Sequence, residues 1–109
     1  MTKKLVMNGA ITQITNTIQE LKEPQKRLLR FIAAKGKATE KELWFVHSNK
    51  PYVGKAAVLL HMMLGGLKNA NLITVDNGTA TWNMPNILGA IMDNVDAEKA
   101  EQYIKSLLL

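Results

Sequence analysis

Apolar residues recur at helical spacing along the first part of the chain. From Ile11 to Leu21 an apolar residue stands at every third or fourth position, with polar residues between them, which predicts an amphipathic helix over about 9–21. A second helix is predicted from Pro24, because proline suits the first turn of a helix. It ends at Lys35 and Gly36, since a glycine after a terminal lysine is typical of a helix C-terminus.

Two more helices are predicted before residue 71. The first opens at Thr39, whose hydroxyl can pair with the first turn while the carboxylate of Glu42 pairs back, and it ends near His47. The next begins around Pro51 and ends near Asn71. It has the strongest helical period in the chain, with one apolar face formed by Val53, Ala56, Ala57, Leu60, Met63, Leu64 and Leu67.

A β-hairpin follows. Residues 72–75 and 79–82 are rich in β-branched and aromatic side chains, and they flank Asp76-Asn77-Gly78, a sequence that favours a tight hairpin turn. Beyond it, apolar residues from Ile87 to Val95 predict another helix, and Asp96 restarts one that runs to Leu108. The predicted fold class is mostly α with a small β-hairpin.

Length and composition favour one domain over residues 1–109. With 109 residues, of which 47% are hydrophobic, the chain can bury a hydrophobic core without disulfides or a bound metal. Cysteine is absent, which excludes disulfides, thiolate nucleophiles and cysteine-ligated metals. We find no secretory signal and no apolar run long enough to cross a membrane. We therefore expect a soluble protein in the cytoplasm or at the nucleoid, with no membrane partner.

Charge is unevenly distributed. Residues 1–75 contain 12 Lys and Arg against four Asp and Glu, whereas residues 76–109 contain two against five. The basic part indicates a surface that faces a polyanion, and a merely solubilising surface explains it equally well.

The order of elements adds a resemblance. Three helices between Pro24 and Asn71, the last passing directly into a hairpin, resemble the winged helix-turn-helix superfamily of DNA-binding proteins. The run Leu60, Leu64, Leu67, Lys68, Asn69, Ala70, Asn71, Leu72, Ile73 is similar to the family's passage from third helix to first wing strand. The resemblance covers about 24–82. It departs from the family pattern at His47 to Gly54, which is longer than the usual turn.

The resemblance implies a DNA-reading surface on the helix from about Pro51. The implied base-reading candidates are Asn49, Lys50, Tyr52, Lys55 and His61, and Gly54 would allow close approach of the backbone. The implied phosphate-binding candidates, on the two preceding helices, are Lys26, Arg27, Arg30, Lys37 and Lys41. The alternative for these charged residues is that they form an ordinary solvated face. For His61 the alternative is a structural role, and Trp44 and Trp82 are most simply interpreted as packing residues.

Two features favour a different function. The wing tip, Asp76, Asn77, Gly78 and Thr79, has a carboxylate and no basic residue, so it would repel phosphate. Val58, Leu59 and Met62 also lie away from the main apolar stripe, which is typical of a helix that is covered on two sides or contacts a partner. A winged-helix module for protein–protein interaction, within a larger complex, is therefore the alternative to a DNA-binding protein.

The terminal helices, about 9–21 and 86–108, carry apolar stripes that must be covered. We expect a homodimer through these helices, and the alternative is that they fold back on their own domain. We expect no enzyme, cofactor or metal, because the chain has two histidines and no catalytic or nucleotide-binding motif. The leading hypothesis is a sequence-specific double-stranded DNA-binding protein that acts as a dimeric transcriptional regulator or as a DNA-segregation or organising adaptor.

Overall fold

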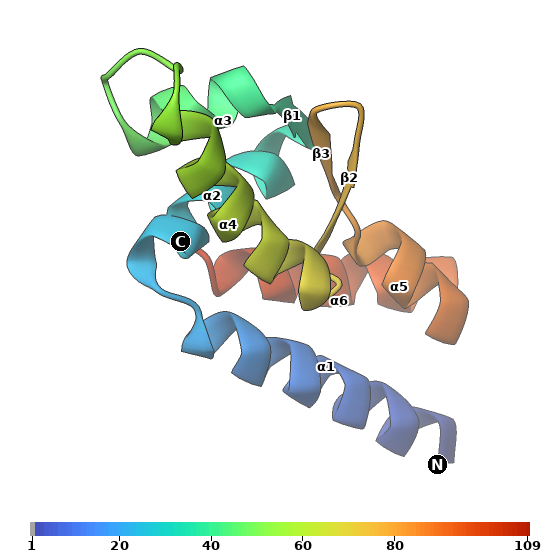
Figure 1. Cartoon of the computed structure of the whole chain (residues 1–109). Helices are drawn as coiled ribbons and strands as arrows, with labels where there is room; N and C mark the ends of the chain where they lie inside the picture. Colours follow the sequence, from blue (N-terminus) through green and yellow to red (C-terminus); the bar gives the residue numbers. More distant parts are fainter. Residues whose placement is uncertain (1) are drawn as a thin grey trace.

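The computed structural model describes residues 2–109, with side chains from residue 9 onward. This part of the chain is mostly helical with a small antiparallel sheet, which confirms the predicted fold class (Figure 1). Its elements, in chain order, are α1 (Thr2–Glu20), α2 (Glu23–Lys35), β1 (Lys37–Thr39), α3 (Glu40–His47), α4 (Lys55–Asn69), β2 (Ile73–Asp76), β3 (Thr79–Trp82), α5 (Met84–Ile91) and α6 (Asn94–Ser106).

The sheet has a third strand that the sequence pattern does not predict. Its strand order is β1-β3-β2, and Thr39 pairs with Thr79, which in turn pairs with Asp76. Strand β1 has three residues and a single buried one, Ala38, so it is too short to show alternation. Lys37 therefore lies on a strand, and its expected place on a helix is wrong.

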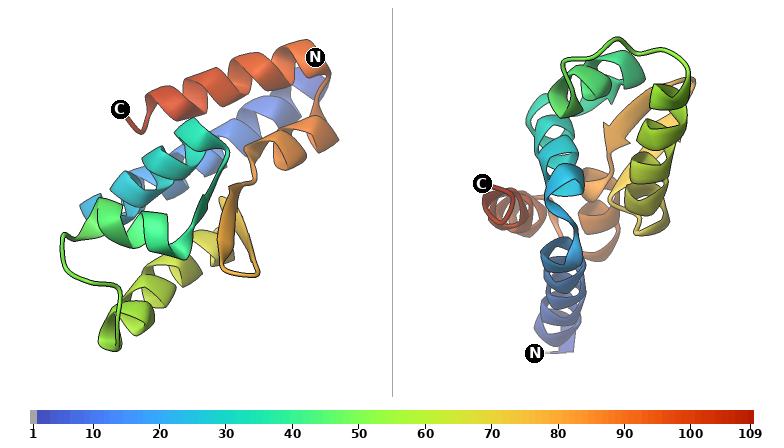
Figure 2. Two further views of the ribbon diagram at one scale, coloured as in Figure 1. Left: turned by 90° about the horizontal axis from the view of Figure 1, so that it is seen from above. Right: turned by 60° about the vertical axis from the view of Figure 1, so that its left-hand side comes forward.

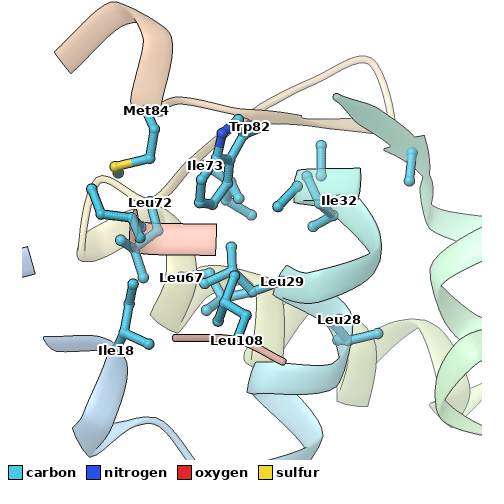
Figure 3. Close-up of a cluster of buried hydrophobic side chains, with 14 of the residues drawn as sticks. Ile18, Leu28, Leu29, Ile32, Leu67, Leu72, Ile73, Trp82, Met84 and Leu108 are labelled. Atoms are coloured by element: carbon cyan, nitrogen blue, oxygen red, sulfur yellow. The ribbon is translucent and has the colours of Figure 1, made fainter. Parts of the chain in front are cut away.

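Helix α2 runs through the middle of the core. Its buried residues Leu28, Leu29 and Ile32 pack between α4 and the sheet, with Leu67 and Trp82 among their neighbours (Figure 3). The whole buried cluster is apolar, and no polar or charged residue in the described part of the chain is classed as buried. Burial of apolar area on α2, α4 and the sheet thus fixes where α4 lies.

The start of α4 differs from the sequence expectation. The helix begins at Lys55 rather than near Pro51, and residues 48–54 form an open loop. Gly54 has φ +60°, outside the helical region, and the backbone carbonyl of Lys50 accepts a hydrogen bond from the indole N–H of Trp44. Val53, expected on the apolar face of the helix, is consequently 71% exposed in this loop.

The capping and turn predictions are confirmed. The Thr39 hydroxyl accepts from the Glu42 amide at 3.2 Å, and the Glu42 carboxylate accepts from the Thr39 amide at 3.1 Å. At the hairpin tip Asn77 and Gly78 have φ +49° and +74°, the positive values that a two-residue turn needs. Asn71, with φ +63°, makes the junction from α4 to β2.

The terminal helices pack on their own domain. Ile18 of α1, Leu88 of α5 and Ile104 of α6 are each at most 1% exposed within the common core. Helix α1 begins at Thr2, before the expected residue 9, and its first half extends beyond the body (Figure 1). The predicted helix to Val95 is too long: α5 ends at Ile91, because Asp93 caps α6 through the Asp96 amide at 2.8 Å.

Helix α6 lies on the opposite side of α2 from α4 (Figure 2). Its C-terminal end contacts α2, where Leu108 and Arg30 meet. Within the described residues, no helix combines the length and the apolarity that crossing a bilayer requires.

Candidate nucleic-acid interface

Trp44 holds the loop between α3 and α4. Trp44 is 5% exposed, and its indole N–H donates to the Lys50 carbonyl oxygen at 2.6 Å. The ring centroid of Tyr52 is 5.9 Å from that of Trp44, and the centroid of His47 is 5.4 Å away. This aromatic group packs under the loop, so the backbone that carries Asn49 and Lys50 has a defined path into α4.

Glu40 connects four segments of the surface. Its backbone N–H donates to the Gly78 carbonyl at 3.0 Å, which joins α3 to the hairpin tip. One carboxylate oxygen pairs with Nε2 of His61 on α4 at 2.5 Å, and the other accepts from the Tyr52 hydroxyl at 3.5 Å. Glu40 therefore ties the loop, α4 and the hairpin to the start of α3.

Tyr52 and His61 are engaged in this cluster. Burial, followed by the charge of Glu40 and its hydrogen bond, raises the pKa of Tyr52, so the hydroxyl stays a donor. His61 is more than half exposed, but its ring is directed at Glu40 over a shallow pocket that Lys68 also lines. Of the five base-reading candidates, these two contact Glu40, whereas Asn49, Lys50 and Lys55 are exposed and form no ion pair among the described residues.

The lysines of α3, the loop and α4 are exposed and lack carboxylate partners. Among the described residues, no ion pair is formed by Lys41, Lys50, Lys55 or Lys68. Helix α4 has no carboxylate at all. We call Lys41, Asn49, Lys50, Lys55 and Lys68 the basic face; Lys50 and Lys55 line one cleft, whereas Lys68 is near the other end of α4 and lines a separate pocket with Glu40 and His61.

Both carboxylates of α3 are used within the fold. Glu40 is held as above, and Glu42 pairs with Lys35 and closes the Thr39 cap. The hydrogen bond from Lys35, together with those from Thr39, lowers the pKa of Glu42 to about 2. Neither carboxylate of α3 forms an ion pair with a lysine of the basic face.

The remaining phosphate candidates are spread over other surfaces. Lys37 is exposed on β1, Arg27 is exposed on α2, and Lys26 is half-buried on α2. Arg30 lies on the side of α2 that the C-terminal end covers, and its Nε donates to the Leu108 carbonyl oxygen. Arg30 is thereby separated from the basic face.

The hairpin tip has the acidic character that its sequence indicates. Asp76 and Asn77 are exposed, Gly78 and Thr79 are half-buried, and no basic side chain belongs to this turn. The tip nevertheless contacts α3 through the Gly78 carbonyl. The hairpin thus has a structural link to the start of α3.

An apolar cleft lies beside the basic face. It is lined by Trp44, Lys50, Pro51, Val53, Lys55, Ala56 and Leu59. The sequence left open whether Val58, Leu59 and Met62 are covered by the fold or contact a partner, and all three are exposed. Val53 and Phe45 are also exposed, which the sequence pattern does not indicate. Phe45 is 57% exposed and resembles a core residue in a helical pattern, so only the packing of α3 reveals its position.

Comparisons with known proteins give no further guide. No protein-family model, no curated protein and no solved structure matches this chain. Across the described residues, no group of three or more His, Asp or Glu side chains lies close enough to hold a metal ion.

Proposed function

We propose that this protein binds double-stranded DNA through the basic face, with α4 as the recognition helix. The observation that carries the proposal is the charge of that face. Four exposed lysines on α3, the loop and α4 have no ion-pair partner among the described residues, while the two carboxylates of α3 are paired with His61 and Lys35. A polyanion is the partner that such a surface favours.

The topology supports the same function. The order α2-β1-α3-α4-β2-β3, with strands arranged β1-β3-β2, resembles that of winged helix-turn-helix proteins, in which the third helix of the core enters the major groove. That helix corresponds here to α4. Its first turn, with Lys55 and the preceding loop residues Asn49 and Lys50, is the part best supplied with groups that can hydrogen-bond to base edges.

The proposed roles follow from the geometry. Lys50, Lys55 and Asn49 contact bases and nearby phosphates, whereas Lys41 and Lys68 contact phosphates. Tyr52 and His61 act as positioning residues through Glu40. Since each neutralised phosphate releases a counterion, four lysine contacts give a slope of about −3 to −4 in log K against log salt.

The proposal extends to assembly and mode of action. We propose a homodimer that forms through the first half of α1, which extends beyond the body of each copy. Such a dimer would present its two copies of α4 to successive half-sites on DNA. The protein acts by occupying its site, as a regulator of transcription or as a DNA-organising adaptor, without catalysis. The acidic residues of α6 are on the opposite side of α2 from α4, where they do not oppose phosphate.

Fluorescence anisotropy with a labelled 20-base-pair duplex tests the proposal. The double variant Lys50→Ala/Lys55→Ala is expected to bind at least tenfold more weakly than the wild type, and its salt slope is expected to be shallower by about 2. Lys99→Ala, an exposed lysine on α6, is the matched control and should bind like the wild type. Equal affinity of the double variant and the control would overturn the placement of the interface.

A further inference from the structure

Exposed apolar side chains are concentrated on α3, the loop and α4, the elements that carry the basic face. The large hydrophobic residues that are most exposed in the described part of the chain include Phe45 on α3, Val53 in the loop, and Val58, Leu59 and Met62 on α4. Val53 and Met62 are each 71% exposed. DNA does not account for them, because base edges are read mainly by hydrogen-bonding groups and only the thymine methyl offers an apolar contact.

These side chains form a defined surface. Val58 and Met62 are one turn apart on α4, and Leu59 lies beside them and lines the cleft with Trp44 and Val53. We call Val53, Val58, Leu59 and Met62 the apolar stripe. In the next turn of α4, a Cβ added at Gly65 would meet no atom within 4 Å, so a partner can approach closely there.

Charge decides what covers this stripe. Lys50 and Lys55 are lining residues of the cleft, and Lys68 lies near the other end of α4, whereas α4 itself has no carboxylate. A second copy of α4 would bring further lysines to the stripe and no carboxylate to pair with Lys50 and Lys55. A partner with carboxylates beside its apolar residues would bury the apolar stripe and also form ion pairs with Lys50 and Lys55.

We infer that the apolar stripe is a docking site for an acidic amphipathic helix of another protein, and that this helix competes with DNA for the basic face. An apolar side chain of the partner enters the cleft over Leu59, and its neighbours at i+3, i+4 and i+7 follow α4. Glutamates or aspartates on the edges of the partner helix contact Lys50 and Lys55. The docking stands on the apolar stripe and on the lysines that line its cleft, whereas the competition rests on the proposed function.

The probe is a labelled 18-residue helical peptide with leucines at i, i+3, i+4 and i+7 and glutamates on both edges. A second peptide has lysines in place of the glutamates. The protein variants are Val58→Ser/Met62→Ser on the stripe and Val95→Ser/Tyr103→Ser on α6, which removes apolar side chains of similar exposure elsewhere. Circular dichroism checks that each variant is folded.

The glutamate peptide is expected to bind the wild type saturably. Binding should be at least tenfold weaker to Val58→Ser/Met62→Ser and unchanged for the α6 variant. The lysine peptide should bind at least tenfold more weakly than the glutamate peptide. If the stripe variant fails to fold, Lys55→Glu replaces it, and that change should weaken the glutamate peptide and strengthen the lysine peptide.

Three results would overturn the docking site: no saturable binding, equal binding to the stripe variant, or a stripe variant that converts a dimer into a monomer in light scattering. The last would assign the stripe to a second copy of this chain. Competition is tested by adding unlabelled glutamate peptide to the DNA complex, where displacement is expected and a persistent complex contradicts it. If the wild type binds the peptide but no DNA, the proposed function fails while the docking site stands.

Discussion

Trp44→Phe tests how the loop of the basic face is held in place. The substitution removes the indole N–H that donates to the Lys50 carbonyl at 2.6 Å, and it leaves space beneath the loop at a position that is 5% exposed. Loss of one such hydrogen bond and of part of a buried ring lowers the free energy of unfolding by about 2 kcal/mol. The melting temperature should therefore fall by roughly 8–16 °C.

Trp82→Phe is the matched control. Trp82 is 4% exposed, and its indole N–H donates to the Glu101 carboxylate at 3.0 Å, far from the loop in sequence. Thermal unfolding followed by circular dichroism should show comparable losses for both variants. At 10 °C, where both are expected to be folded, only Trp44→Phe should bind duplex DNA more weakly, by about threefold to tenfold, because Lys50 loses its anchor.

Either of two results would contradict the role of Trp44 in holding the loop. If Trp44→Phe is as stable as the wild type, the indole does not hold the loop. If the two variants bind DNA equally, the path of the loop does not determine how Lys50 meets DNA.

Three further results are expected. The pKa of Glu42 is lowered to about 2 by Lys35 and Thr39, so its carboxylate stabilises the fold above pH 4.5 and this contribution is lost as the pH falls toward 2. Glu42→Gln should therefore be less stable than the wild type at pH 7, and urea titrations should show the difference shrinking between pH 4.5 and 2. Gly78→Ala, at φ +74°, should lower the free energy of unfolding by about 1 kcal/mol, and an unchanged urea midpoint would contradict the assigned turn. Ile18→Ala, at 1% exposure, should lower it by about 2–5 kcal/mol, whereas no change would mean that α1 does not pack on its own domain.

Local sequence signals were sufficient where a few neighbouring residues determine the structure. Thr39 and Glu42 predict the start of α3 because both halves of the cap lie within one turn. Asn77 and Gly78 predict the hairpin because their backbone angles are set by residue type. In both cases the contacts that stabilise the element are local.

The features that the sequence did not predict depend on contacts between distant residues. Strand β1 forms only because β3, some forty residues later, supplies its partner Thr79. The late start of α4 follows from the hydrogen bond between the Trp44 indole and the Lys50 carbonyl, which cannot be predicted from the spacing of apolar residues. Glu40, absent from the sequence candidates for binding, joins Tyr52 and His61 only once α3 and α4 have packed.

Nuclear magnetic resonance titration of the isotope-labelled protein with a DNA duplex tests the central claim most directly. Backbone amide shifts are expected to change most at Lys41 and over residues 49–55, with smaller changes at Lys68 and none above background on α6. The changes should diminish as salt is raised, because the contacts are with phosphates. Shifts concentrated on α6 or α1, or no shifts at low salt, would contradict DNA binding by the basic face.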